Sequence, residues 1–446
     1  MAALFGTDGV RGKAGQYPLD PPTVRRVGGA LARVLHQKDG PVRFLSGRDT
    51  RESGTWIERE LARGIGSQGG SLTSAGVVPT PAVAYLTPRK GYTAGVVISA
   101  SHNPFEDNGI KVFSGAGEKF TEALERQVEA EVADTSWSVP LGDADDVPVV
   151  DDVADYLDHV RAVLPVGTAS MRLVVDCANG ATTTVAPRLF EALGMDARFI
   201  GCEPDGRNIN LECGSTAPAR LSRAVVAHGC QLGIAYDGDG DRAIFVDAHG
   251  TVVNGDAVML MCAKQLKAEG RLNGHAIVAT VMSNIGLEIA LREAGIGLVR
   301  CPVGDKYVME EMLRSTLSLG GEQSGHVIFA DHLFTGDGLA TSLNVLRTMA
   351  ATGRTLADLA SDLTSYPQVL MNLRVQERVD LATVPAVAAV LASVERRLDG
   401  QGRLLVRYSG TEPLLRVMLE GKDEAEIRRW GQEIIDAVTA SVGAAV

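Results

Sequence analysis

The sequence predicts an α/β protein with three mixed α/β domains, whose sheets are largely parallel, followed by a smaller C-terminal α+β domain. Short apolar, β-branched runs alternate with amphipathic stretches along most of the chain, which is typical of α/β layers. The pattern changes after residue 366, where predicted strands follow one another more closely. The 446 residues also suggest about three or four domains, at roughly 100–200 residues each.

The individual elements follow from hydrophobic periodicity and from glycine near the helix ends. In the first three domains the predicted strands are Val42–Ser46, Thr93–Ser99, Arg172–Asp176, Leu232–Tyr236, Ala243–Asp247, His275–Thr280 and Gly297–Cys301. The predicted helices there are Thr55–Gly64, Ala181–Leu193, Ala219–His228, Asp256–Lys267 and Asn284–Ala294. Because these strands are almost continuously apolar, we expect them to be buried on both faces in mostly parallel sheets.

The segment after residue 366 has a different order of predicted strands and helices. Its predicted strands are Val369–Val375, Arg403–Tyr408 and Leu414–Leu419, and its predicted helices are Leu381–Arg397 and Asp423–Val442. We place domain boundaries in the acidic, proline-bearing stretch Ser138–Asp152, near His249–Asp256 and near Ser365–Gln368. The expected domains are therefore 1–150, 151–252, 253–366 and 367–446.

Composition limits the classes of function. The chain is 45% hydrophobic and 22% charged, as expected of a globular protein able to bury several cores. It has 55 acidic against 43 basic residues, a formal charge of −12, which disfavours nucleic acid and anionic membranes as partners. Many of the 50 glycines lie in short polar clusters, a pattern that favours several ligand-binding loops over disorder.

Cysteine usage and the N-terminus predict a cytoplasmic protein. The six cysteines form no C-x-x-C pair and no zinc-binding spacing, so we expect reduced thiols. The first residues show no basic region followed by an apolar core, and no run of 18 apolar residues occurs, so neither a secretory signal nor a membrane span is expected.

The segment Ile98–Pro104 is the first that indicates chemistry. It follows a predicted strand, and Asn103-Pro104 turns the chain away from helix, which leaves Ser101 in a polar turn. Taken alone, this is most simply an ordinary turn serine. The next segment, Asn108–Lys111, is predicted to be a second turn whose lysine leads into a strand, and a cation beside the serine favours phosphoryl transfer.

The segment Asp237-Gly238-Asp239-Gly240-Asp241-Arg242 predicts a metal site. Three carboxylates at alternate positions, separated by glycines, can turn toward one cation. An EF-hand calcium loop requires glycine at its sixth position and glutamate at its twelfth, where this sequence has Arg242 and Ala248. Hard oxygen ligands favour Mg²⁺, and Arg242 is positioned to neutralise a transferring phosphoryl group. A solvated acidic turn is the plainer alternative.

Two further loops carry weaker signals. The segment Gly320–His326 offers a carboxylate, a hydroxyl and an imidazole in a glycine-rich turn, which suits sugar hydroxyls or an ammonium group. The segment Arg407–Pro413 contains Ser409, Gly410 and Thr411, which together with an arginine can form a phosphate-binding nest. This second loop reads equally well as a structural β-turn between strands.

These four loops, in this order and at about these separations, resemble the α-D-phosphohexomutases over essentially the whole chain. The opening segment Phe5–Gly12 is similar to that of the phosphoglucosamine mutase branch. The resemblance implies four domains around a central cleft, and interconversion of glucosamine 6-phosphate with glucosamine 1-phosphate through glucosamine 1,6-bisphosphate. It also implies a role in supplying UDP-N-acetylglucosamine and cell-wall precursors.

By this resemblance, Ser101 is the phosphoserine that donates and recovers the phosphoryl group. The other implied site residues are Asp237, Asp239 and Asp241 with a phosphoserine oxygen for Mg²⁺; Arg11, Lys111 and Arg242 around the transferring group; Glu322 and Ser324 for sugar hydroxyls; and Arg407, Ser409 and Thr411 for the distal phosphate. Lys111 and His326 are both candidates for the general acid and base, and His326 is equally well explained as a structural histidine.

The resemblance further implies one Mg²⁺ per chain, a hexose bisphosphate as activator and a phosphosugar substrate, and it leaves a homodimer open. Two alternatives remain: within the resembled family, a phosphomannomutase/phosphoglucomutase, and outside enzymes, a non-catalytic calcium-binding protein. Other enzyme classes fit poorly. The G-x-G-x-x-G at Gly64–Gly69 comes after a helix, and the sequence contains no Walker loop and no G-x-S-x-G.

Overall fold

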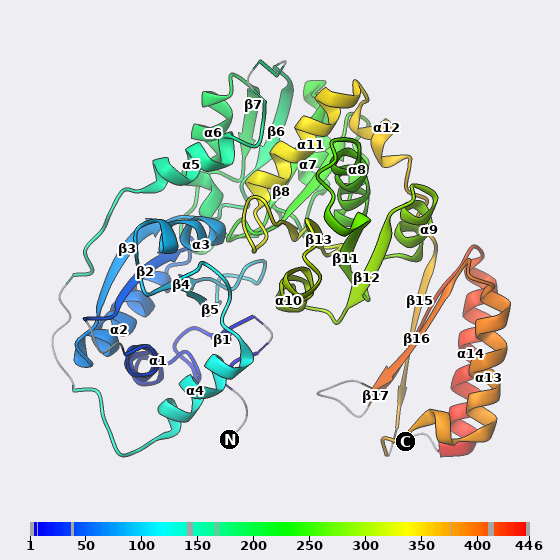
Figure 1. The fold of residues 1–446 in the computed structure, drawn as a ribbon, viewed down its shortest axis with the longest axis horizontal. Coiled ribbons are helices and arrows are strands. Elements are labelled where there is room, and N and C mark those ends of the chain that lie inside the picture. Colours follow the sequence, from blue (N-terminus) through cyan, green and yellow to red (C-terminus); the bar gives the residue numbers. More distant parts are fainter. Residues whose placement is uncertain are drawn as a thin grey trace. The chain divides into compact units, whose positions relative to one another are not determined.

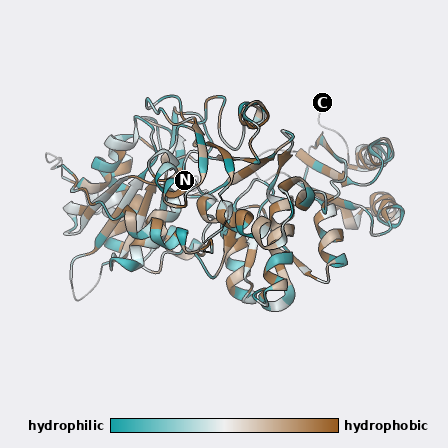
Figure 2. Ribbon diagram, turned by 90° about the horizontal axis from the view of Figure 1, so that it is seen from above, coloured by the Kyte–Doolittle hydropathy of each residue, from teal (hydrophilic) through white to brown (hydrophobic). Residues whose placement is uncertain are grey.

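The computed structural model describes residues 4–6, 8–36, 40–140, 146–165, 167–168, 170–375, 377–408 and 414–442. The chain forms two compact units. Unit 1 comprises Met1–Met282 and Leu298–Asp362, and unit 2 comprises Ser283–Gly297 and Leu363–Val446. Across the described residues, hydrophobic positions concentrate in the strands, whereas the helices alternate hydrophobic and hydrophilic positions (Figure 2). No helix in the described part of the chain is long and apolar enough to cross a membrane.

The first sheet of unit 1 has helices on both faces (Figure 1). Its order is β1-β5-β4-β2-β3, with β2, β3 and β4 parallel and with β5 and β1 antiparallel to their neighbours. Its elements are β1 (Val10–Lys13), α1 (Pro21–Val34), β2 (Arg43–Arg48), α2 (Gly54–Ser67), β3 (Ser71–Val77), α3 (Thr80–Arg89), β4 (Ala94–Ile98), β5 (Asp107–Ser114) and α4 (Glu122–Ala133). Phe44 of β2 packs with α1 and α2, and the next residue, Leu45, packs with Leu86 of α3. Successive side chains of a strand point to opposite faces, so this sheet is buried on both.

The second sheet has the order β10-β9-β8-β6-β7. Strands β6, β7 and β8 are parallel, and β9 and β10 add on antiparallel. Its elements are α5 (Val153–Arg161), β6 (Arg172–Asp176), the 3₁₀ turn η1 (Ala181–Thr184), α6 (Ala186–Ala192), β7 (Asp196–Ile200), α7 (Ala219–His228), β8 (Leu232–Tyr236), β9 (Ala243–Asp247) and β10 (Val252–Val253). Leu221 and Val225 of α7 pack against Val174 and Ala235 of this sheet.

The third sheet has the order β12-β11-β13-β14. Its strands and the other helices of unit 1 are α8 (Gly255–Ala268), the 3₁₀ turn η2 (Asn273–His275), β11 (Ala276–Thr280), β12 (Gly297–Cys301), α10 (Asp305–Ser315), β13 (Leu319–Gly321), β14 (Val327–Phe329), α11 (Gly338–Thr352) and α12 (Leu356–Ala360). Asp337 caps the start of helix α11, because its carboxylate accepts a hydrogen bond from the Ala340 amide at 2.9 Å.

The three sheets repeat one topology. Their strand orders contain the series β5-β4-β2-β3, β9-β8-β6-β7 and β14-β13-β11-β12. In each series the first two strands form an antiparallel pair and are consecutive in the sequence. The loop inside that antiparallel pair lies at the same place in each sheet. These loops are residues 99–106, 237–242 and 322–326, and they contain three of the four segments singled out from the sequence.

Unit 2 is the smaller α+β unit. Its sheet is antiparallel in the order β15-β17-β16 and is covered by two helices, α13 and α14 (Figure 1). Its elements are α9 (Ile285–Glu293), β15 (Gln368–Arg374), the 3₁₀ turn η3 (Leu381–Thr383), α13 (Pro385–Leu398), β16 (Arg403–Tyr408), β17 (Leu414–Glu420) and α14 (Glu424–Val442). The buried carboxylate of Glu420 accepts a hydrogen bond from the Ile285 amide at 3.2 Å, which caps the start of α9.

The predicted fold class is confirmed, with three corrections to its elements. The predicted helix Ala181–Leu193 is a 3₁₀ turn followed by α6, and Leu381–Arg397 is a 3₁₀ turn followed by α13. In both cases a proline lies in the first turn of the α-helix, where it starts a helix well but cannot continue one. The predicted turn at Asn108-Gly109 is part of strand β5, because both residues pair with β1 there, and pairing with β4 begins at the next residue, Ile110.

Candidate active site

Three buried carboxylates form the centre of the site. Asp237, Asp239 and Asp241 follow β8, and each offers an oxygen within 4.8 Å of the others. The loop curls because the intervening glycines tolerate close backbone approach. A Cβ on Gly238 would lie 2.5 Å from the Ser101 carbonyl oxygen, and Gly240 has a φ of +70°. Burial, together with Asp241 and Asp239, raises the pKa of Asp237 well above its usual value.

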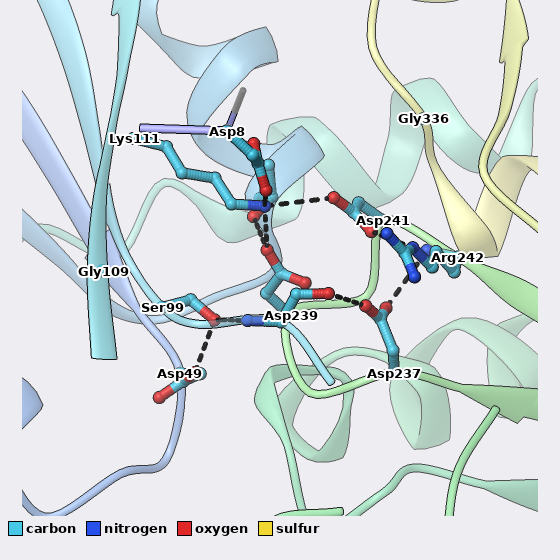
Figure 3. Close-up of polar contacts among 12 residues, drawn as sticks. Asp8, Asp49, Ser99, Gly109, Lys111, Asp237, Asp239, Asp241, Arg242 and Gly336 are labelled. Carbon is cyan, nitrogen blue, oxygen red and sulfur yellow. Dashed lines mark hydrogen bonds and ion pairs between the residues drawn. The ribbon is translucent and has the colours of Figure 1, made fainter. Parts of the chain in front are cut away.

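Lys111 of β5 reaches into this cluster from the first sheet (Figure 3). Its Nζ lies 2.9 Å from Asp239 Oδ2, 3.2 Å from Asp241 Oδ2 and 3.1 Å from Asp8 Oδ2. Burial alone would lower the pKa of Lys111, but these three carboxylates raise it well above its usual value. Lys111 is therefore a buried ammonium, as the sequence predicted for a cation next to the serine loop.

Ser101 faces the carboxylates from the loop between β4 and β5. Its hydroxyl donates a short hydrogen bond to Asp237 Oδ2, and its side chain is buried. Its φ of +52° lies in the left-handed region, which costs a non-glycine residue roughly 1–2 kcal/mol. Such strain at a polar, buried residue is a feature of functional sites, because surrounding contacts have to maintain it.

Arg11 and Asp8 extend the charged network toward β1. Arg11 and Lys111 both contact the Asp8 carboxylate, and Lys119 bridges Asp8 and Asp305. Burial would raise the pKa of Asp8, but Lys111, Lys119 and Arg11 together lower it well below its usual value. Asp8 lies in the opening segment whose resemblance was noted, yet the sequence analysis gave it no role. Lys119 and Asp305 carry no sequence signal of their own, and only the fold brings them together.

Arg242 and His326 join the second and third loops. Residues 242 and 326 form an isolated antiparallel bridge, and the Ala243 amide donates to the Gly325 carbonyl at 3.1 Å. The Gly336 amide donates to His326 Nε2 at 3.1 Å, so the neutral ring carries its proton on Nδ1, which faces Asp241 Oδ1 at 3.6 Å.

Burial and the nearby carboxylates have opposite effects on the pKa of His326. Burial lowers its pKa, but Asp241, Asp305 and Glu322 outweigh burial and raise it. The Gly336 contact favours the neutral ring, because a doubly protonated imidazole could not accept that hydrogen bond. The contact geometry therefore gives His326 as a neutral imidazole whose Nδ1–H points at the metal-loop carboxylate.

Glu322 and Ser324 lie in the same loop as His326. Ser324 Oγ donates to Glu322 Oε2 at 3.3 Å, and the Gly304 amide donates to Glu322 Oε1 at 3.2 Å. Burial would lower the pKa of Arg242, but the carboxylates of Asp241, Asp237 and Glu322 together raise it.

The fourth predicted loop belongs to unit 2. Arg407 is exposed at the end of β16, opposite Arg416 of β17. Ser409 and Thr411 lie outside the described residues. Within unit 1, the fold therefore brings together Ser101, Lys111, Arg11, Arg242, His326 and the three aspartates.

The donor set fits a hard divalent cation. Asp239 Oδ1 and Asp241 Oδ1 are buried and have no hydrogen-bond partner, although their other oxygens bind Lys111. A bound ion with oxygen ligands would satisfy these two oxygens and offset the charge of the three crowded carboxylates. A second group, Asp241, Asp305 and His326, is close enough to share an ion. It is less suited, because Lys119 binds Asp305 and the Gly336 amide occupies His326 Nε2.

Four family models match the chain in succession. They describe the phosphoglucomutase/phosphomannomutase alpha/beta/alpha domain I over residues 2–138, domain II over residues 154–250, domain III over residues 254–366 and the C-terminal domain over residues 370–437. Together these models cover most of the sequence.

Curated relatives match the chain along nearly its whole length. The phosphoglucosamine mutase of Solibacter usitatus is 48% identical over 444 residues, which is 99% of each chain. That of Geotalea daltonii is 45% identical over 449 residues, again 99% of each chain, and that of Moorella thermoacetica is 48% identical over 431 residues, 96% of this chain and 97% of the relative.

Solved structures share the fold. A phosphoglucomutase/phosphomannomutase family protein from Burkholderia thailandensis matches with a TM-score of 0.81 and 24% identity, covering 98% of this chain and 97% of its own. Aspergillus fumigatus N-acetylphosphoglucosamine mutase, solved with GlcNAc-6P and magnesium, matches with a TM-score of 0.68 and 18% identity, covering 98% and 96%. At these identities the likeness shows the fold alone.

Proposed function

The chain belongs to the phosphoglucomutase/phosphomannomutase family and is an isomerase with phosphoglucosamine mutase activity, and we propose that it acts through a phosphorylated Ser101 and a Mg²⁺ ion. The observation that carries this proposal is the hydrogen bond from the Ser101 hydroxyl to Asp237, in a cluster that also contains Asp239, Asp241 and Lys111. The phosphomannomutase/phosphoglucomutase reading is the second candidate, because the family models carry those names.

The charges around Ser101 support both the phosphoserine and the metal. A phosphoserine carries about −1.5 to −2 charges near pH 7, and it would adjoin three buried carboxylates. Such a site requires cations. Lys111 supplies one, Arg242 and Arg11 supply two at the rim, and a Mg²⁺ held by Asp237, Asp239, Asp241 and a phosphoserine oxygen would supply the rest. When bound, the ion would neutralise charge on the transferring group.

The proposed reaction consists of two phosphoryl transfers. In the first, the C1 hydroxyl oxygen of glucosamine 6-phosphate forms a bond to the phosphorus, the phosphorus–Oγ bond of Ser101 breaks, and the hydroxyl proton ends on Oγ. The product is glucosamine 1,6-bisphosphate. After the sugar turns around, Ser101 Oγ takes the 6-phosphoryl group and the C6 oxygen takes the proton. Positioning and charge neutralisation supply most of the rate in such transfers.

Lys111 and His326 have different parts in this scheme. Three carboxylates hold Lys111 as an ammonium, which suits charge neutralisation more than proton transfer. His326 is the other candidate for proton transfer. Because its Nδ1 already carries the proton of the neutral ring, it would have to give up the Gly336 contact at Nε2 before it could accept a proton. Glu322 and Ser324 would bind the sugar hydroxyls, and Arg407, Ser409 and Thr411 the distal phosphate.

The proposal also covers the domain bounds, the cellular location, the activator and the partners of the protein. We divide the chain into domains 1–150, 151–252, 253–366 and 367–446, each with one of the four loops. We place the protein in the cytoplasm, a location that suits its six free cysteines. A hexose bisphosphate would phosphorylate Ser101 and so act as activator, and the product would feed UDP-N-acetylglucosamine and cell-wall precursor synthesis. We treat neither nucleic acid nor membrane as a partner, and a homodimer fits the proposal equally well as a monomer.

The deciding experiment measures glucosamine 1-phosphate formed from glucosamine 6-phosphate, with Mg²⁺ and a trace of glucose 1,6-bisphosphate. Wild type is compared with Ser101→Ala and with Ser67→Ala, a change near the end of α2. We expect the Ser101→Ala protein alone to lose turnover, and intact mass to show one phosphate on wild type and none on that variant. Turnover by the Ser101→Ala protein would refute the phosphoserine. Faster turnover of glucose or mannose phosphates would favour the second candidate, and calcium binding without any turnover would contradict both.

A further inference from the structure

We propose that Arg51 is a positioning residue that closes a circuit of hydrogen bonds around the backbone of Ser101 and thereby keeps the serine hydroxyl hydrogen-bonded to Asp237. The inference rests on the proposed function, because it explains how the fold keeps Ser101 ready for phosphoryl transfer. Neither the family models nor the names of the relatives assign a role to Arg51.

The circuit of hydrogen bonds starts and ends at Ser101. Its amide donates to Ser99 Oγ at 2.9 Å. Ser99 Oγ in turn donates to Asp49 Oδ2 at 2.5 Å (Figure 3). Arg51 Nε donates to the same Asp49 oxygen at 2.9 Å, and Arg51 Nη2 donates to the Ser101 carbonyl at 2.9 Å. Both backbone polar groups of Ser101 therefore belong to one closed circuit, and neither can rotate without breaking it.

The guanidinium of Arg51 is buried, and among the residues that the structure describes it donates hydrogen bonds only to Asp49 and within the serine loop. Its side chain is 0% exposed, and it is the largest of the fully buried side chains in the described part of the chain. Besides Ser101, its guanidinium donates to the carbonyls of Asn103 and Pro104. A planar guanidinium can hold one carboxylate and three carbonyls of a turn at the same time, which a lysine ammonium cannot.

The circuit opposes a real conformational preference. Ser101 has a φ of +52°, which L-residues avoid. If the circuit opened, Ser101 would relax toward negative φ and its Oγ would turn away from Asp237. A shift of about 1 Å in a reacting atom costs on the order of 10²-fold in rate.

A second donor reaches the same carbonyl from the second sheet. Asn210 Nδ2 donates to the Ser101 carbonyl at 2.9 Å and to the Asn103 carbonyl at 3.1 Å. The segment that carries Arg51 is itself tied to the second sheet, because Thr50 Oγ1 donates to the Asn179 carbonyl at 2.5 Å. The orientation of Ser101 is thus set jointly by the first and second sheets.

The test uses two variants that open the circuit in different ways. Arg51→Ala removes the guanidinium, and Asn210→Gly removes the second donor without strain, because residue 210 has a φ of +59° that glycine adopts freely. Each protein is pre-phosphorylated with glucose 1,6-bisphosphate, and its phosphate content is measured by intact mass. We expect kcat for glucosamine 6-phosphate to fall about 10²-fold in Arg51→Ala and less in Asn210→Gly, with KM changed by less than about threefold.

Chemical rescue separates positioning from simple loss of stability. Guanidinium chloride at tens of millimolar, below denaturing concentration, should restore kcat of Arg51→Ala at least about tenfold, whereas equal sodium chloride should not. Arg26 is a matched control, because its guanidinium also donates to the carbonyls of Val132, Asp134 and Trp137, but beside α4. Arg26→Ala should lower the melting temperature and leave kcat unchanged.

A crystal structure of Arg51→Ala or Asn210→Gly gives an answer that does not depend on turnover. Ser101 at negative φ, with Oγ away from Asp237, would support the inference. Ser101 still near +52° on Asp237, or kcat within twofold of wild type in both folded variants, would overturn it. Absence of mutase activity in the wild type would instead count against the proposed function, and the Ser101 geometry would still decide the role of Arg51.

Discussion

Lys111 Nζ lies 2.9 Å from Asp239 Oδ2, although the two residues are 128 positions apart and belong to different sheets. Lys111 comes from the strand after the serine loop, and Asp239 lies in the loop of the next sheet. Thr80 Oγ1 donates to the same Asp239 oxygen at 2.6 Å. The serine loop and the acidic loop are therefore coupled through a buried cation, and the variants below test that coupling.

Lys111→Met should reduce both activity and stability. It leaves the buried carboxylates of Asp239 and Asp241 without their ammonium, a loss that costs about 3–5 kcal/mol for a broken buried ion pair. We expect kcat to fall by about 10²–10³, since a cation at the transferring group is lost. Urea denaturation and steady-state kinetics measure the two effects. Lys13→Met, at the exposed end of β1, should match wild type; an equal effect there would contradict the assignment.

Mg²⁺ should stabilise the folded chain through the acidic loop. An ion that binds only the folded state adds about 2.7 kcal/mol at a concentration of 100 Kd. Asp239→Asn should remove most of this increment, because it replaces a carboxylate that has a buried, unpartnered oxygen. The melting temperature is measured with Mg²⁺ and with EDTA. Asp196→Asn, on an exposed position of β7, should keep the full shift, and a shift retained by Asp239→Asn would locate the ion elsewhere.

Gly180→Ala should displace the backbone of the acidic loop at Gly238. A Cβ at residue 180 would lie 2.4 Å from the Gly238 carbonyl oxygen, so the backbone has to move at a cost of about 1–3 kcal/mol. We expect weaker Mg²⁺ binding, by about tenfold, and lower kcat. Gly66→Ala in α2 is the control, because nothing lies within 4 Å of its Cβ position. It should stabilise the protein by about 0.5–1 kcal/mol and leave activity intact. Unchanged Mg²⁺ affinity in Gly180→Ala would refute the contact.

Asp362→Asn should lower stability in a pH-dependent way. Arg354 binds both oxygens of Asp362, at 3.0 and 2.8 Å, and with Lys264 lowers the pKa of this carboxyl to about 2 from an ordinary 3.8. Because the folded pKa is depressed, the stabilisation is complete above about pH 4 and disappears as the pH falls toward 2. Urea midpoints of variant and wild type should differ at pH 7, and the difference should shrink as the pH falls from about 4 toward 2. Glu310→Gln, an exposed change on α10, should show no such difference, and a gap independent of pH would contradict the ion-pair explanation.

Much of the local structure could be read from the sequence. Strands such as Arg172–Asp176 and Leu232–Tyr236, and helix Ala219–His228, have the predicted bounds, because their apolar periodicity is strong and glycine ends the helix at Gly229. The errors have a common cause. At Asn108-Gly109, turn-forming residues lie in a strand because pairing with β1 overrides their local preference.

Some residues of the candidate site could be selected from the sequence, and others could not. The sequence identified Ser101, Lys111 and the three aspartates because each lies in a polar segment directly beside a strand. It gave no role to Asp8, Thr80, Arg51 or Asn210, whose signals are single polar residues without a motif. Their importance arises from contacts between segments distant in sequence, such as the 2.9 Å hydrogen bond from Asn210 to the Ser101 carbonyl.

The sequence by itself determined the α/β class, the individual chemical groups and the family, because hydrophobic periodicity and short motifs are local properties of the chain. Only the tertiary structure decided which of those groups meet. Three sheets with the same strand order present the same antiparallel loop, and packing brings the Ser101, Asp237–Arg242 and His326 loops into contact. The left-handed conformation of Ser101 and the raised pKa of Lys111 arise from that packing, since both depend on neighbours supplied by other parts of the fold.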